Sequence, residues 1–234
     1  MLKRLGYDGI GYTGTKGIPE MLAALDRFGL KMFSTYVRVD VGPKGPRYDP
    51  GLPGAIQQLK GRPTIIWLYV IGKGANAEQQ TVRIVREIAD LAAQSGLKVA
   101  TYPHTGFYIA RVEDSVRIAK KVDRPNVGAS FNLCHWLKVD GRRLEARLTE
   151  AMPYLYLVSI NGADAGDTRA MGWDRLIQTL DRGTYDVAGL LKRLRRLGYR
   201  GPIGLQCYNI PGAPEENLRR SIQAWKKMWD EMEQ

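Results

Sequence analysis

The chain has only two histidines, His104 and His135, and each follows a short apolar run that is typical of a β-strand. The runs are Lys98-Val-Ala-Thr-Tyr-Pro-His104 and Asn126-Val-Gly-Ala-Ser-Phe-Asn-Leu-Cys-His135, with a helix-like stretch between them. In strand–helix–strand units the carboxyl ends of the strands lie side by side, and ligands bind there. Imidazole, with a pKa of about 6.5, is suited to proton transfer near neutral pH. The sequence therefore predicts one site that contains both histidines.

Polar and aromatic side chains close the other predicted strands. Because side chains alternate along a strand, Tyr102 shares a face with His104, and the remaining candidates at strand ends are Trp67, Tyr69, Asn132, Ser159, Asn161, Gln206 and Tyr208. Amides and hydroxyls bind sugar hydroxyls, and the rings of Trp67, Trp136 and Tyr208 offer apolar faces. This composition, almost free of carboxylates, indicates a polyol ligand.

The predicted chemistry is removal of a proton from a carbon next to a carbonyl. His135 and His104 are the candidates for base and acid, with Tyr102 as an alternate, and Lys73 or Lys138 would stabilise the enolate. The residues predicted to bind substrate hydroxyls are Asn132, Ser159, Asn161 and Gln206. Structural roles remain open: His104 capping a loop, the amides satisfying buried backbone groups, and the aromatic residues packing in the core.

Short β-branched or aromatic runs alternate with amphipathic stretches along the whole chain. Strands are predicted over residues 7–12, 31–39, 64–71, 98–102, 127–133, 154–161 and 203–208. Helices are predicted over 18–28, 54–59, 77–94, 112–122, 145–151, 187–197 and 214–232. Such alternation means parallel strands joined by right-handed crossovers, and no linker divides residues 1–234. We expect a single α/β domain.

Seven strand–helix units in succession favour a barrel over an open sheet. The chain begins with Leu2-Lys-Arg-Leu-Gly, which reads as the end of a helix. The prediction is a (β/α)8-type TIM barrel that lacks its first strand and most of its first helix. An exposed sheet edge would result, and proteins usually cover such edges; a homo-oligomer is one way to cover it.

The composition limits the classes of partner and the cellular location that we expect for this protein. The 35 Lys and Arg residues exceed the 24 Asp and Glu residues and give a net charge of +11, but much of the excess lies on helical stretches where basic residues face solvent. A basic stripe interleaved with aromatic residues would indicate nucleic-acid binding. The sequence has no such stripe, so we expect no nucleic-acid partner. No apolar run approaches the roughly 20 residues that span a membrane, no signal-peptide core begins the chain, and its two cysteines form no CxxC motif. We expect a cytoplasmic protein.

On these residues the chain resembles the xylose-isomerase-like TIM-barrel superfamily of sugar isomerases, epimerases and inosose dehydratase. The family-like segments are Arg124-Pro-Asn-Val-Gly-Ala-Ser-Phe-Asn-Leu-Cys-His135, Leu180-Asp-Arg-Gly-Thr-Tyr-Asp186, and the flanks at Leu5-Gly-Tyr-Asp-Gly-Ile and Gly198-Tyr-Arg-Gly-Pro-Ile-Gly-Leu-Gln206. The resemblance implies that His135 corresponds to a substrate-contacting histidine. It likens His104 to the second histidine of a His-Pro-His strand end.

The same resemblance implies a metal site made of two glutamates, an aspartate and a histidine. The matching positions in this chain hold Tyr102, Asn132, Ser159 and Gln206. Neutral oxygens bind Mg²⁺ or Mn²⁺ poorly, so no metal cofactor is expected, although a divalent Mn, Mg or Zn ion bound through His104, His135 and Asn132 remains an alternative. The three-metal cluster of the related endonuclease IV needs more histidines than this chain has.

The leading hypothesis is a carbohydrate isomerase or epimerase that acts on a keto-sugar or polyol by proton abstraction next to a carbonyl. A 3-keto-glycoside lyase or hydratase would share the enolate step and is the first alternative. A non-catalytic sugar-binding paralogue is the second, because every expected metal carboxylate is replaced.

Overall fold

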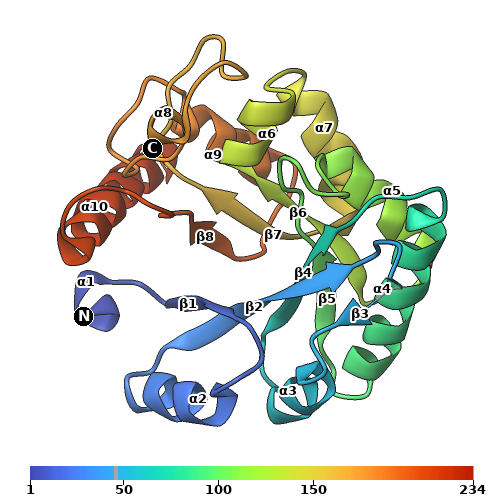
Figure 1. The fold of residues 1–234 in the computed structure, drawn as a ribbon. Coiled ribbons are helices and arrows are strands. Elements are labelled where there is room, and N and C mark those ends of the chain that lie inside the picture. Colours follow the sequence, from blue (N-terminus) through green and yellow to red (C-terminus); the bar gives the residue numbers. More distant parts are fainter. Residues whose placement is uncertain (45–46, 234) are drawn as a thin grey trace.

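Seven parallel strands form a nearly closed barrel in the computed structural model, which describes residues 1–44 and 47–233 (Figure 1). Their order is that of the chain: β1 (Gly9–Thr13), β2 (Lys31–Asp40), β4 (Ile65–Ile71), β5 (Lys98–Thr101), β6 (Val127–Asn132), β7 (Leu155–Ile160) and β8 (Ile203–Leu205). The short β3 (Arg47–Tyr48) pairs antiparallel with β2. All seven predicted strands are present, and the predicted TIM-barrel architecture is confirmed.

Helices cover the outside of the barrel in the order that the sequence predicts. They are α2 (Ile18–Arg27), α3 (Leu52–Gln58), α4 (Ala77–Ala93), α5 (Val112–Val122), α7 (Leu144–Ala151), α9 (Val187–Arg196) and α10 (Pro214–Glu233). The short α1 (Leu2–Leu5) is the helix end that the sequence indicates before Gly6. Short elements that the sequence analysis did not predict are α6 (Leu133–Val139), α8 (Trp173–Leu176) and a 3-10 turn (Met152–Tyr154). Within the described ranges, no helix combines the length and the apolar character needed to cross a membrane.

The predicted end of the strand before His135 is wrong, because helix α6 begins there. The strand was expected to continue to Leu133, with His135 just beyond it, but β6 ends at Asn132 and a helix starts at once. Leu133, Trp136 and Leu137 recur at helical spacing, and all three are buried, so one face of this helix packs into the core. His135 is therefore fixed on a helix rather than on a loop.

Alternation along the strands separates two layers of packing. Outward side chains such as Val37 and Val158 join the helices in two large apolar clusters. Inward side chains form a small floor inside the barrel, where Ile65, Ala100 and Leu157 pack beneath Trp67. Above this floor the inward positions become polar and aromatic, which places the candidate site at the carboxyl ends of the strands.

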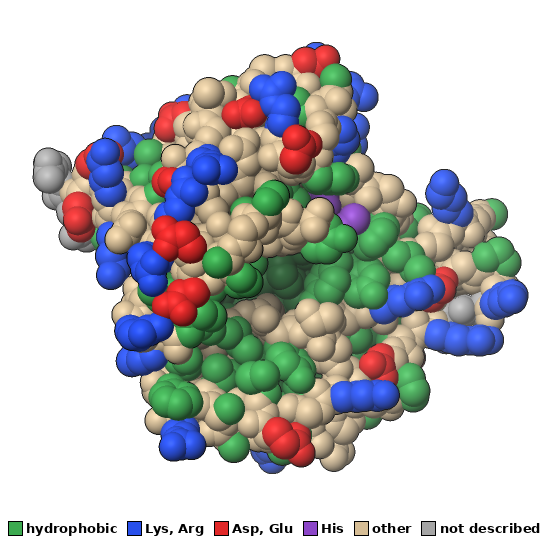
Figure 2. All heavy atoms as spheres, turned by 60° about the vertical axis from the view of Figure 1, so that its left-hand side comes forward, with side chains coloured by type: hydrophobic (Ala, Val, Ile, Leu, Met, Phe, Trp, Pro, Cys, Tyr) green, Lys and Arg blue, Asp and Glu red, His purple; other side chains and the backbone are tan. Residues whose placement is uncertain are grey.

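The barrel is open between β1 and β8, because these strands are not paired in the described part of the sheet. The seam is spanned on the outside, where α1 lies beside α10 (Figure 1). There the hydroxyl of Tyr7 donates to the carbonyl of Leu218 at 2.8 Å, and Arg4 pairs with Glu215 at 2.6 Å. Seen from this side, the molecule is hollowed, and hydrophobic side chains line most of the hollow (Figure 2).

Candidate active site

Tyr102 and His135 form the buried centre of the site. Tyr102 directly follows β5, His135 lies on α6, and the phenol oxygen is 3.0 Å from Nε2 of the imidazole. Burial, together with nearby His104, lowers the pKa of His135 to about 3. Burial also raises the pKa of Tyr102 far above its ordinary value. Both groups are therefore neutral near pH 7, and each can donate or accept a hydrogen bond.

His104 lies against His135 and is more open to solvent. The centroids of the two imidazole rings are 3.9 Å apart, and the ring of Phe107 stacks on the other face of His104 at 3.8 Å. Nδ1 of His104 is 2.7 Å from the carbonyl oxygen of Thr105. Because a carbonyl only accepts, Nδ1 carries the proton and Nε2 keeps its lone pair. Burial lowers the pKa of His104, which favours the neutral imidazole.

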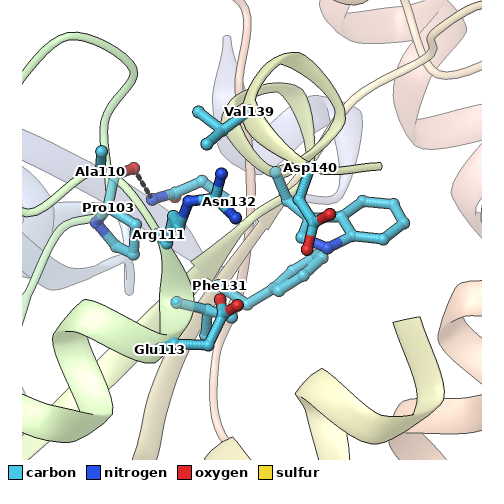
Figure 3. Close-up of a pocket in the computed structure, with 10 residues that line it drawn as sticks. Pro103, Ala110, Arg111, Glu113, Phe131, Asn132, Val139 and Asp140 are labelled. Atoms are coloured by element: carbon cyan, nitrogen blue, oxygen red, sulfur yellow. Dashed lines mark hydrogen bonds between the residues drawn. The ribbon is translucent and has the colours of Figure 1, made fainter. Parts of the chain in front are cut away.

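The four residues at the implied metal-ligand positions bond to one another or to the backbone. Ser159 donates to Oδ1 of Asn132 at 2.5 Å, and Nδ2 of Asn132 donates to the carbonyl of Pro103 at 3.0 Å, as Figure 3 shows. Nε2 of Gln206 lies 3.4 Å from the hydroxyl of Tyr102. This network spans the ends of β5, β6, β7 and β8 without a formal charge.

This donor set does not fit a divalent metal. Hard cations require anionic oxygens, whereas Oδ1 of Asn132 is already occupied by a hydroxyl donor. Across residues 1–44 and 47–233, no group of three or more His, Cys, Asp or Glu side chains converges as a metal site would. The residues present favour hydrogen bonding to a neutral or weakly polar ligand group.

Aromatic side chains line one wall of the site. Tyr36 stacks on Tyr69 at 4.3 Å and meets the edges of Trp67 and Tyr102 at 5.7 and 4.8 Å. Nε1 of Trp67 donates to Ser130 at 2.8 Å, which fixes the indole. The sequence analysis identified Trp67 and Tyr69 but missed Tyr36, although alternation along β2 places it on the inward face.

A long segment after β7 covers the opposite side. Trp173, at the start of α8, meets the ring of His135 edge-on at 5.3 Å. Asn161 anchors the base of this segment, because its Nδ2 donates to the carbonyls of Gly162 and Leu176. Nζ of Lys138 donates to the carbonyls of Arg169 and Met171, at 2.9 and 2.6 Å. The sequence analysis did not identify Trp173 or Phe107, because each lies outside the predicted strands and helices and no motif marks it.

The remaining predicted residues lie away from this centre. Trp136 is buried against Phe131 in the helix layer, and Tyr208 is 73% exposed. Lys73 is exposed in the loop after β4. Cys134 is fully buried, and burial raises the pKa of its thiol to about 12, so the thiol is not suited to act as a nucleophile.

A small cavity lies behind Asn132, between α5 and α6, and the carboxylates of Glu113 and Asp140 point into it (Figure 3). Nε of Arg147 lies 2.7 Å from Oε1 of Glu113 and 3.5 Å from Oδ2 of Asp140. Among the described residues, Nε1 of Trp136 has no hydrogen-bond partner. The cavity volume of about 10 Å³ is close to the space of one water, so the cavity is too small to hold a substrate.

Comparison with known proteins places the chain in a family. The model of the xylose isomerase-like TIM barrel matches residues 52–228. The chain belongs to this family. At its strand ends the chain has neutral side chains, whereas the sequence resemblance implies metal-binding residues at those positions.

A curated relative and two solved structures are similar over different extents. The chain is 26% identical to 3-dehydroshikimate dehydratase of Pseudomonas aeruginosa over 129 residues, which are 53% of this chain and 20% of that protein. The structure of D-allulose 3-epimerase from Methylomonas sp. has a TM-score of 0.76 at 16% identity and covers 96% of this chain and 88% of its own. The zinc-bound IolI protein has a TM-score of 0.70 at 16% identity and covers 99% and 90%. The two structural likenesses show a shared fold.

Proposed function

We propose that this protein is an enzyme that removes a proton from a carbon next to the carbonyl of a keto-sugar or related polyol. The observation that carries the proposal is the contact of His104 with the Tyr102–His135 pair. This contact places an imidazole with a free lone pair beside two neutral hydrogen-bonding groups. Membership of the family supports a sugar-directed activity.

His104 acts as the base. Its Nδ1 proton is held by the carbonyl of Thr105, and among the described residues its Nε2 has no hydrogen-bond partner. Nε2 takes the carbon-bound proton, the C–H electron pair moves into the new carbon–carbon double bond, and the carbonyl oxygen becomes an enolate oxygen. A positioned imidazole base contributes about 10²- to 10⁴-fold to such a step.

Tyr102 and His135 stabilise the enolate oxygen. The high pKa of Tyr102 keeps its proton on the phenol, and the hydroxyl donates to the oxygen as negative charge develops. His135 remains neutral and orients the phenol through Nε2. Donors fixed in a buried site act more strongly on developing charge than the same groups in water.

The remaining residues bind the substrate or hold the site in place. Gln206 presents its amide at the strand ends, and Trp67 with Tyr36 offers a ring face to a C–H surface. Asn132 and Ser159 are bonded to each other and to the backbone, so they hold the strand ends in place beside the substrate. Lys138 and Asn161 hold the covering segment with Trp173 over His135. If a proton passes from the neighbouring hydroxyl oxygen to the enolate oxygen, return of the carbon-bound proton to the former carbonyl carbon gives an isomer. Protonation of the original carbon from its opposite face gives an epimer.

A dehydratase or lyase outcome shares this first step. If the carbon next to the enolate carries a hydroxyl or glycosyl oxygen, the enolate electron pair forms the new double bond, the C–O bond breaks, and the leaving oxygen takes the proton that His104 carries. The products are an unsaturated ketone and water or an alcohol. The similarity to 3-dehydroshikimate dehydratase over 129 residues supports this outcome as the second candidate.

The test is exchange of carbon-bound protons for deuterium, followed by NMR in D₂O with ketohexoses and 3-keto-glycosides. We expect exchange that survives a chelator, falls at least about 100-fold in His104→Gln, and falls about 100-fold in Tyr102→Phe. Tyr199→Phe is the matched control, because it removes another buried hydroxyl, which bonds to Pro202 at 2.8 Å outside the site. Saturable chemical-shift changes without exchange would instead indicate a non-catalytic sugar-binding protein.

A further inference from the structure

The loops after β2 and β4 bring an excess of positive charge to one side of the neutral site. In segments 38–44, 47–48 and 71–74 there are four cationic side chains, Arg38, Lys44, Arg47 and Lys73, and one carboxylate, Asp40. The loops touch, since a Cβ on Gly72 would lie 2.5 Å from the backbone nitrogen of Gly42. In Figure 2, Lys and Arg side chains lie on the side of the hollow where the histidines are seen, as well as on the opposite side.

Arg38 is the cation that the strand geometry directs toward the site. Tyr36 points into the barrel, because its ring contacts Trp67 and Tyr102. Arg38 lies two residues farther along β2, hence on the same face, and its register partner on β4 is Tyr69, whose ring stacks on Tyr36. The guanidinium therefore stands at the rim of the aromatic wall.

The hydrogen-bonding capacity of Arg38 is only partly used. Nη2 donates to Oδ2 of Asp40 at 2.9 Å, and the Arg38 side chain is 56% exposed. Among residues 1–44 and 47–233, its Nε and Nη1 have no hydrogen-bond partner. Oδ1 of Asp40 accepts from the backbone of Gly42, so this carboxylate is held in place and fixes the guanidinium without covering it. A planar guanidinium with free N–H groups binds a carboxylate or phosphate by paired hydrogen bonds.

We propose that Arg38, assisted by Lys73, forms an anion subsite, and that the substrate is a polyol with an anionic oxygen group. The neutral centre at Tyr102 and His135 binds the carbonyl part of the molecule, while Arg38 binds a carboxylate or a phosphate ester at the rim. The proposal rests on the proposed function for the location of the reacting carbon, but the anion subsite is a binding property that is tested without catalysis.

The experiment compares three ligands that share one ring type: myo-inositol, which is neutral, quinate, which carries a carboxylate, and myo-inositol 1-phosphate. Dissociation constants are measured by NMR titration at low and moderate salt. We expect an anionic ligand to bind at least about tenfold more tightly than myo-inositol at low salt and to lose this advantage as salt rises. Tighter binding of quinate identifies a carboxylate subsite, and tighter binding of the phosphate identifies a phosphate subsite.

Variants decide whether Arg38 is responsible. Arg38→Met abolishes the preference for the anion and leaves the affinity for myo-inositol unchanged, and Lys73→Met weakens the preference. Lys31→Met, which removes a cation from the opposite end of β2, is the matched control and changes neither. Equal affinities for all three ligands, or a preference that survives in Arg38→Met, overturn the proposal. An anion preference without proton exchange on any substrate refutes the proposed function and leaves the subsite standing.

Discussion

The hydroxyl of Tyr102 lies 3.0 Å from Nε2 of His135, at a strand end where the family resemblance implies a metal-binding glutamate. A neutral pair thus stands in place of a carboxylate and its cation. Because both partners are more than nine-tenths buried, an uncompensated charge on either one would be costly. The surrounding residues Asn132, Ser159 and Gln206 are neutral as well. All four strand ends therefore differ from the metal-binding residues that the resemblance implies, not Tyr102 alone.

Acid should destabilise this protein through His135. Its pKa of about 3 when folded lies below the ordinary value near 6.5, so the unfolded chain binds a proton that the folded chain does not bind. The stability is therefore complete above about pH 6.5 and falls as the pH decreases toward 3, by up to about 1.4 kcal/mol per pH unit. His104 acts in the same direction.

Thermal unfolding of the wild type and His135→Gln at pH 7 and pH 4.5 measures this effect. The surface carboxylates with lowered pKa, such as Asp26 and Asp90, also lose their favourable pairing in acid, but they do so equally in both proteins. The variant should lose less stability between the two pH values. Parallel losses in the two proteins would show that His135 is not held neutral.

The sequence predicted the barrel because the hydrophobic period is strong and local, as in the stretch 112–122, whose predicted bounds coincide with those of α5. It predicted that His104, His135, Tyr102, Asn132, Ser159 and Gln206 meet, since strand ends converge in any parallel barrel. It did not predict α6, because Asn132-Leu-Cys-His continues an apolar strand pattern, and only packing of Trp136 and Leu137 selects the helix. The roles of Lys138 and Asn161 as anchors depend on a long loop whose path no local pattern specifies.

Restoring a carboxylate at position 132 should harm the fold rather than create a metal site. In Asn132→Asp, the group that donates to the carbonyl of Pro103 is replaced by an oxygen that repels it. A buried carboxylate at a 1% exposed position also loses hydration. We expect a loss of about 2–4 kcal/mol in the free energy of unfolding and no tight binding of Mn²⁺. Denaturant unfolding and metal titration measure the two effects, and a stable, metal-binding variant would contradict the assignment of a neutral network.

The covering segment should loosen when Lys138 is replaced. Lys138→Met keeps most of the apolar side chain but removes both hydrogen bonds to the carbonyls of Arg169 and Met171. We expect faster amide exchange over residues 164–173, little change in the melting temperature, and weaker binding of any ligand that contacts Trp173. Lys192→Met, on the exposed surface of α9, is the control. Unchanged exchange in this segment would mean that other contacts hold it.

Removal of Arg147 should weaken the contact of α7, which carries this residue, with Glu113 on α5 and with Asp140 at the end of α6. Its guanidinium lies between the carboxylates of Glu113 and Asp140, and the side chains of all three are 25% exposed or less. Arg147→Met leaves two partly buried like charges without their cation, which we expect to cost about 1–3 kcal/mol of unfolding free energy. Arg196→Met is the matched control, because its pair with Glu145 is 65% and 48% exposed and should contribute at most about 0.5 kcal/mol. Urea unfolding at pH 7 compares the two variants, and equal losses would show that the Arg147 cluster behaves as an ordinary surface pair.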